Sequence, residues 1–232
     1  MCRELAAIVV RETSSSPRRF IRGDFTPHHS ELMVIHQLKE GAGAKAGNAN
    51  IARYEYFSDD GDWSKATARL DEKVKPSWLD EECEAWVKAQ FEAWRDEITI
   101  TGDVVAVVGR KVIATGKCTI GIAVACTILL GLNAKVEIKG EIKSHVEFGY
   151  VSGSGSITTG DVSGYGSITT DDVSGSLKTG SVSGSGSITT GSVSGSGSIT
   201  TGYVSGSITT GSVEDTATVA DAVRAAAKKG SK

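Results

Sequence analysis

The sequence predicts an α+β N-terminal module, followed by a β-solenoid and a short C-terminal helix. Three observations lead to this fold class: a tandem repeat in the C-terminal third, mixed strand and helix patterns near the N-terminus, and an alanine-rich basic tail. The expected boundaries are 1–98 for the α+β module, 99–213 for the solenoid and 214–232 for the helical cap and tail.

The tandem repeat is the strongest of these signals. Val151–Ser181 and Val182–Ser212 differ at six of 31 positions and are therefore identical at 25. Such self-similarity is typical of stacked units that bury a seam which no single unit could bury alone. Because repeats build rods and surfaces more often than active sites, the pattern indicates a shape rather than an activity.

Each repeat contains three shorter units marked by apolar anchors. In the first copy these anchors are Val151, Ile157, Val162, Ile168, Val173 and Leu177. Even spacings within a strand put two anchors on the same face, because side chains alternate. The pattern predicts strands of seven, seven and five residues, joined by glycine-containing corners such as Thr158–Asp161. Glycine on the buried face is expected to allow close backbone approach across a narrow interior.

Three architectures fit this pattern. In a parallel β-helix, one coil of about 31 residues would hold the three short strands and stack valine on valine. An antiparallel meander would use the Thr-Thr-Gly corners as hairpin loops, and three chains wrapped around one axis, as in phage fibre shafts, would repeat similarly. The shortened third strand favours the solenoid, because a meander has no reason to shorten every third strand.

The flanking segments extend this architecture. Val104–Val112 and Lys135–Phe148 alternate apolar with polar or small residues, so the β region begins near Thr99. Valine and isoleucine are more frequent there, which predicts the best solenoid core near its start. Ala217–Lys229 is expected to form a short helix that caps the far end.

The N-terminal module shows both strand and helix patterns. Leu5–Val10 is an apolar run fit for a buried strand, and Ile51–Phe57 alternates like a half-buried one. Glu31–Leu38 fits a strand or a short helix. Ser77 is the predicted N-cap of a helix that ends near Ile98. One face of this helix carries the apolar stripe Leu79, Cys83, Trp86, Val87, Phe91, Trp94 and Ile98.

Composition excludes some classes of protein. The net charge of −3 argues against a dedicated nucleic-acid binder, which needs a basic face. The four cysteines lack metal-ligand spacing and read as reduced thiols, which predicts a cytoplasmic location. Ile120–Leu132 is apolar for only thirteen residues, whereas a membrane span needs about 20. No signal peptide, membrane association or cofactor is expected.

Two resemblances add to this reading. MCRELAAIVVRET, HSELMVIHQL, IARYEYF and DWSKATARLDEKVKPSWLDEECEAW together resemble the leading module of uncharacterised phage and prophage proteins. In those proteins an MCK- or MCR-type start precedes a repeat array. The resemblance implies a viral or mobile-element origin, in the host cytoplasm or the virion, and no known activity. The repeat half, through VEIKGEI, is loosely similar to bactofilins, whose β-helical cores polymerise end to end.

One residue suggests an enzyme. Removal of Met1 would leave Cys2 as an N-terminal nucleophile with its own amino group as base. The alternative function is therefore an N-terminal-cysteine hydrolase or amidotransferase-like enzyme that uses the solenoid as a scaffold. Arg3 and Glu4 depart from the glycine-rich segment that follows such nucleophiles. His28, His29 and His36 lack carboxylate or cysteine neighbours at ligand spacing, so no metal site is predicted.

The favoured function is a non-enzymatic, phage-type interaction or assembly protein. Its solenoid is expected to form a homo-oligomer or to bind a host or virion protein, because an open solenoid end presents unpaired strand edges. It would then serve as a virion accessory part or as an inhibitor of a host defence protein. The predicted contacts are the residues that break the repeat: Tyr150, Asp161, Tyr165, Asp171, Asp172 and Tyr203.

Overall fold

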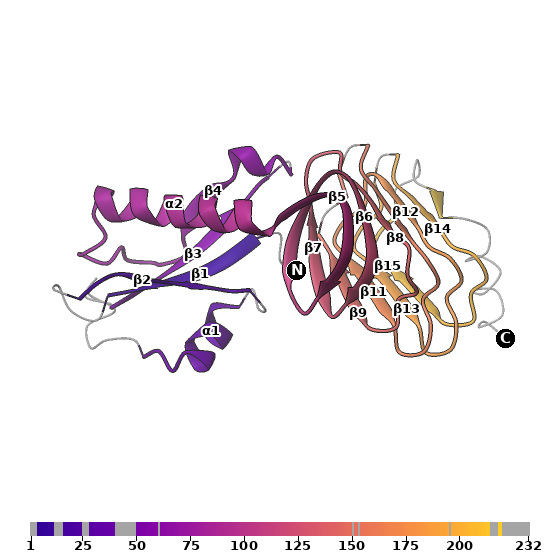
Figure 1. The fold of residues 1–232 in the computed structure, drawn as a ribbon, viewed down its shortest axis with the longest axis horizontal. Coiled ribbons are helices and arrows are strands. Elements are labelled where there is room, and N and C mark those ends of the chain that lie inside the picture. The colour runs from indigo at the N-terminus through magenta and orange to yellow at the C-terminus, as the bar shows by residue number, and fades with distance from the viewer. Residues whose placement is uncertain are drawn as a thin grey trace. The chain divides into compact units, whose positions relative to one another are not determined.

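The computed structural model divides the chain into two compact units, Cys2–Glu97 and Ile98–Lys232 with Met1. Each unit is described by itself (Figure 1). The structure describes residues 4–11, 16–24, 28–39, 50–59, 61–149, 151–152, 154–194, 196–213 and 218–219.

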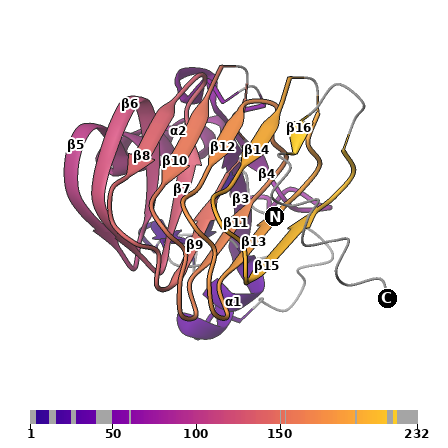
Figure 2. The same ribbon diagram turned by 90° about the vertical axis from the view of Figure 1, so that its right-hand side faces the viewer.

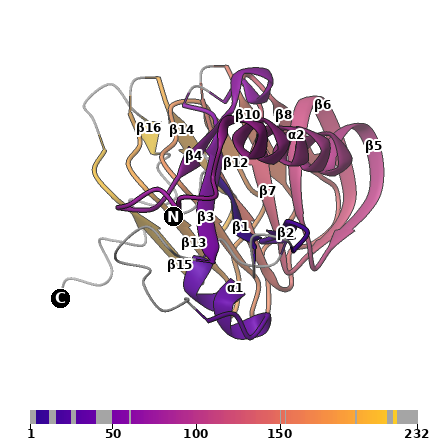
Figure 3. The same ribbon diagram turned by 90° about the vertical axis from the view of Figure 1, so that its left-hand side faces the viewer.

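The unit Cys2–Glu97 is built on a four-stranded antiparallel sheet in the order β2-β1-β3-β4. Helices α1 and α2 lie on opposite faces of this sheet, and a short 3-10 helix, Trp63–Lys65, precedes β4 (Figure 3). The strands and helices are β1 (Glu4–Val10), β2 (Arg19–Arg22), α1 (His29–Ile35), β3 (Ile51–Phe57), β4 (Thr67–Leu70) and α2 (Glu81–Ile98).

The α2 face of the sheet carries an aromatic core. Phe91 stacks on Tyr56 with ring centroids 5.0 Å apart and meets Phe20 edge-on at 4.9 Å. Trp94 is also fully buried. Aromatic pairs of this kind stabilise a fold by about 1 kcal/mol beyond the burial of their area. On the other face, α1 contributes Leu32 to a cluster with Ile8, Val10 and Ile51.

The two helices of this unit test two predictions from the sequence. The segment that fitted a strand or a short helix is the helix α1. The prediction that Ser77 caps α2 was wrong, because the Asp80 carboxylate accepts a 2.8 Å hydrogen bond from the Cys83 N–H. Asp80 therefore occupies the N-cap position and α2 begins at Glu81. Aspartate is a strong N-cap, so Ser77 remains outside the helix.

The unit that begins at Ile98 is a parallel β-solenoid (Figure 2). From β6, one ladder runs through β7, β9, β11, β13 and β15, and a second runs through β8, β10, β12, β14 and β16; β5 pairs with β6. The strands are β5 (Thr99–Val108), β6 (Lys111–Val124), β7 (Cys126–Leu130), β8 (Lys135–Ile138), β9 (His145–Phe148), β10 (Ser156–Thr159), β11 (Ser167–Thr170), β12 (Ser176–Lys178), β13 (Ser187–Thr190), β14 (Ser198–Thr200), β15 (Ser207–Thr210) and β16 (Thr218–Val219). Every strand pair of the described solenoid is parallel, which excludes the meander.

The coil is shorter than predicted. Ser167 pairs with Ser187 and Ser187 with Ser207, separations of 20 residues, while Ser176 pairs with Ser198, 22 residues on. One coil therefore holds two units of the sequence, eleven plus eleven or eleven plus nine residues, and the two 31-residue copies fill three coils. The predicted coil of about 31 residues with three strands was wrong. Each unit supplies one flat side, and two sides close a coil.

The strands are also shorter than predicted. After Val162, the Gly166 N–H donates to the Ser163 carbonyl at 2.8 Å, and Gly164 has φ +60°. This turn separates the valine from β11, so no seven-residue strand forms. In β10, β11, β13 and β15 both threonines of the Ser-Ile-Thr-Thr segment belong to the strand rather than to a corner. Short units such as Val173–Leu177 omit the turn.

Two kinds of residue build the interior of the later coils. The fully buried anchors are Val151, Ile157, Val162, Ile168, Val173, Leu177, Val182, Ile188, Val193 and Ile199. Buried glycines stand between anchors because successive coils approach closely: a Cβ at Gly166 would overlap the carbonyl oxygen of Ile142, one coil earlier. Glycine is therefore required between stacked coils, not across the interior.

The end of the chain departs from the predicted cap. Thr218 and Val219 form β16, which pairs with β14. The start of the expected helix Ala217–Lys229 is therefore a strand, and the rest of that segment lies outside the described residues. Among the described residues, no helix has the length and apolar character needed to cross a membrane.

Candidate functional site

β15 is the last described strand of its ladder, and among the described strands none pairs with its outer side. The N–H groups of Ser207 and Gly211 donate to the preceding coil, to the carbonyls of Gly186 and Thr190. Because backbone N–H groups point to alternate sides along a strand, those of Ile208 and Thr210 point to the outer side of β15. Within the described part of the chain, no strand pairs with this edge of β15. This outer side of β15 is the candidate contact surface of the last coil.

Burial decreases at the same place. Ile188 in β13 is fully buried, whereas Ile208, directly above it in the register, is only partly buried. The outward positions of β15 are Ser207 and Thr209, without a charge. Native sheets protect open edges with lysine, proline or a bulge. Among its four residues β15 has none of these.

The first coil ends in a strand with a different surface. Among the described strands of the solenoid, β5 pairs with β6 and with no other. Val105 is 86% exposed, and Val108 and Ile122 are also exposed, although valine and isoleucine at these positions would suit a buried strand. Scattered apolar residues are normal on a surface, and these three belong to the paired strands β5 and β6.

Two of the predicted contact residues have roles inside the solenoid. The Asp161 carboxylate accepts a hydrogen bond from the Ser181 N–H at 2.7 Å, and that of Asp172 accepts one from the Ser192 N–H at 2.8 Å. Each aspartate thus satisfies a backbone donor in the next coil. Asp171 lies beside Asp172 and is partly buried.

The two described tyrosines of the predicted set are exposed. Tyr165 is 88% and Tyr203 73% exposed. Tyr203 directly precedes Val204, and Asp161 directly precedes Val162; both valines belong to one line of bridges between coils. Tyr165 lies in the turn after the same line.

The structure therefore gathers Asp161, Tyr165 and Tyr203 along one edge of the solenoid. Asp171 and Asp172 lie on the other edge, before the line that contains Val173. The remaining two candidates, Tyr150 and Cys2, lie outside the described residues.

The described cysteines are poor nucleophiles. Cys83, Cys118 and Cys126 are free and buried. Burial raises the pKa of all three thiols, and it raises the pKa of Cys126 to about 11. A thiol of this kind carries little of the reactive thiolate at neutral pH. These three positions offer no activated nucleophile.

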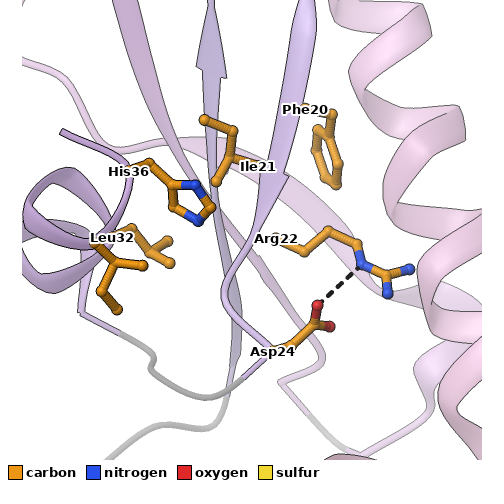
Figure 4. A pocket seen from close by; sticks show the side chains of 7 residues that line it. Phe20, Ile21, Arg22, Asp24, Leu32 and His36 are labelled. Carbon is orange, nitrogen blue, oxygen red and sulfur yellow. Dashed lines mark hydrogen bonds and ion pairs between the residues drawn. The ribbon is translucent and has the colours of Figure 1, made fainter. Parts of the chain in front are cut away.

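A cavity of about 440 Å³ lies between β2 and α1 (Figure 4). Phe20, Ile21, Leu32 and Ile35 supply its apolar wall, and Arg22, Asp24 and His36 its polar groups. The Arg22 guanidinium is already engaged: it pairs with Asp24 at 3.4 Å, bonds Glu97 and lies 5.5 Å from the Trp94 ring centre. Arg22 therefore holds β2 to α2 and is not poised to bind a ligand.

One cluster of polar side chains is not foreseen from the sequence. His29 lies 3.4 Å from Asp71 and also near Glu55. The alternation of Ile51–Phe57 places Glu55 on the other face of the strand from Tyr54 and Tyr56. Nothing in the sequence, however, indicates that the Glu55 carboxylate lies near His29. The three residues are separated by 26 and 16 positions along the chain and meet only in the fold.

Comparison with known proteins adds no relative. No family model matches this chain, and no curated protein or solved structure does either. Evidence for a function therefore comes from the geometry of the solenoid itself.

Proposed function

We propose that this chain is a non-enzymatic, phage-type assembly protein whose solenoid self-associates through its last coil. The observation that carries the proposal is the open edge of β15, which lies in register with identical strand segments on one side and has no described strand on the other. The unit Cys2–Glu97 is covalently joined to the solenoid and is displayed by the assembly.

A second copy of the chain is the occupant that fits this edge best. β13 and β15 already pair isoleucine with isoleucine and threonine with threonine. A further strand of the same kind would bury Ile208 as Ile188 is buried. Hydroxyl side chains on the outside bring no like charges together, so no electrostatic repulsion opposes the contact.

The symmetry of the contact determines the product. Two β15 edges that pair with each other give a closed dimer, whereas β15 on the β5 edge of another copy gives an open filament. Both products share the last coil as a contact.

A foreign partner would bind elsewhere on the same solenoid. The edge with Asp161, Tyr165 and Tyr203 offers two exposed tyrosines, a residue type enriched in protein interfaces. This surface would contact a virion protein or a host defence protein, in the host cytoplasm or the virion, and the N-terminal resemblance to phage proteins supports that setting.

The experiment is light scattering on the full chain over a range of concentrations, with one variant and a matched control. Thr210→Pro removes an outward N–H of β15, and Thr210→Val keeps that N–H and the side-chain shape. Wild type and Thr210→Val are expected to form oligomers, and Thr210→Pro to remain a monomer. A monomeric wild type, or a Thr210→Pro variant that assembles like wild type, contradicts the proposal.

A further inference from the structure

Three side chains from separate elements of the unit Cys2–Glu97 meet on one face of its sheet. His29 is the first residue of α1, Glu55 lies in β3, and Asp71 directly follows β4. One ligand atom from each lies within 4.8 Å of the other two. An imidazole and two carboxylates thus converge on one small volume.

The strand register explains why the two carboxylates lie together. Glu55 is paired with Arg69 in β4, and Asp71 is two residues further along. Side chains two residues apart point to the same face, and the Asp71 N–H donates to the Arg53 carbonyl at 2.9 Å, which continues the ladder. Glu55 and Asp71 therefore both project toward the face that carries α1.

The orientation of the imidazole is fixed by the backbone. His29 Nε2 lies 3.0 Å from the carbonyl oxygen of Tyr54. A carbonyl oxygen only accepts, so Nε2 carries the hydrogen and donates it. Nδ1 then faces the Asp71 Oδ2 at 3.4 Å. A histidine that binds a metal commonly donates its other ring N–H to a carbonyl in this way, which sets the tautomer and the ring orientation.

The spacing also suits a metal ion. Two ligand atoms that each lie about 2.0–2.1 Å from a tetrahedral zinc ion are about 3.4 Å apart, which matches the Nδ1–Oδ2 distance. Without a cation, a neutral His29 would point a lone pair at a carboxylate oxygen. A cation between the two atoms removes that repulsion and balances the charge of both carboxylates.

The neighbouring charges leave this volume available. Arg53 forms a 2.7 Å ion pair with Glu72. Arg69 is exposed, and among the described residues no hydrogen bond or ion pair joins it to Glu55. The Asp71 side chain is 51% exposed, so an ion can enter from solvent and keep water as a further ligand.

We propose that His29, Glu55 and Asp71 bind a divalent transition-metal ion, with Zn²⁺ as the reference ion. The mixed nitrogen and oxygen set favours zinc and its neighbours over Ca²⁺ and Mg²⁺, which prefer oxygen ligands alone. The ion joins α1 to β3 and β4, and this role is independent of assembly through the solenoid.

The test is calorimetric titration of Zn²⁺ into the full chain after removal of metal with a chelator. One ion is expected to bind per chain. Asp71→Asn and Glu55→Gln should weaken binding by more than about tenfold, while His36→Gln, a histidine outside the cluster, should bind as wild type does. Asp71 is exposed enough for its variant to fold, which circular dichroism checks.

Cobalt gives an independent readout. Co²⁺ bound through one nitrogen and carboxylate oxygens produces visible absorption that Asp71→Asn should reduce and excess Zn²⁺ should displace. The proposal is overturned if wild type takes up no ion, or if Asp71→Asn binds as tightly as wild type. The second result would identify His29 and Asp71 as a simple ion pair.

Discussion

The early and late coils of the solenoid differ in how they are held together. The early coils, β5–β9, contain strands of up to fourteen residues and an interior that includes Ile120, Ile128 and Phe148. The late coils, β10–β15, contain strands of three or four residues. Their interior is restricted to one valine, one isoleucine or leucine, one threonine and a glycine per unit.

The two regions differ in which contribution to the free energy of folding dominates. Burial of a large aliphatic side chain stabilises by about 1.5–3 kcal/mol, so the early coils rest on side-chain packing. The late coils bury little per residue and order many glycines, which costs conformational entropy. They depend on backbone ladders and on a coil spacing that only glycine permits. We therefore expect the solenoid to open from its C-terminal end.

The largest expected effect is at a glycine of the late coils. In Gly166→Ala the new Cβ would overlap the Ile142 carbonyl oxygen and force two coils apart, so we expect a loss of about 3 kcal/mol or more in the free energy of unfolding. The control is Gly164→Ala, where φ is +60° but no atom lies within 4 Å. Strain alone should cost about 1 kcal/mol there. If denaturant unfolding gives equal losses of unfolding free energy for the two variants, the close approach of the coils at Gly166 is not what stabilises the late coils.

The second effect compares one buried isoleucine from each region. Ile120→Ala and Ile188→Ala both leave a cavity in a fully buried site and should each cost about 2–5 kcal/mol. We expect Ile120→Ala to lower the stability of the whole solenoid, whereas Ile188→Ala should release only the late coils. Hydrogen exchange read by mass spectrometry distinguishes the two. Loss of protection over residues 99–148 in Ile188→Ala would contradict the separation.

A smaller effect is expected at an aspartate of the late coils. Asp172→Ala removes the acceptor of the Ser192 N–H and should cost about 1 kcal/mol, because that donor loses its partner. Asp172→Asn keeps an acceptor oxygen and should lose less. The midpoints of thermal unfolding of wild type and the two variants measure these differences. An Asp172→Ala variant as stable as wild type would show that this hydrogen bond does not stabilise the protein.

The smallest effect is a chemical signature of the early coils. Burial raises the pKa of Cys126 to about 11, so about 0.1% of this thiol is ionised at pH 8. Cys118 is also buried, with a raised pKa. We expect neither to react with iodoacetamide in the native protein and both to react after unfolding. Rapid native labelling of Cys118 or Cys126, measured by mass spectrometry of peptides, would show that the early coils open as readily as the late ones.

The sequence predicted the solenoid but not its coil. The alternating anchors from Val151 to Ile208 predicted buried lines that stack in register, and these lines are present. The number of sequence units in one coil cannot be predicted from the length of the repeat, because it depends on how two flat sides pack against each other. Likewise, the turn at Gly164 and the strand at Ile168 have similar local composition, and only the hydrogen bonds between coils separate them.

The candidate sites were less predictable. Repeat-breaking positions identified exposed Tyr165 and Tyr203, but Asp161 accepts a hydrogen bond from a backbone N–H of the next coil. The cluster around His29 depends on strand register and helix placement, so it could not be read from spacing.

The most direct test of assembly through the last coil is hydrogen exchange of residues 207–213 as a function of protein concentration. At low concentration the outward amides of Ile208 and Thr210 are expected to exchange quickly. At high concentration a second copy should protect them, while the early coils stay unchanged. Exchange of this segment that is independent of concentration, together with a monomeric mass, would contradict the account.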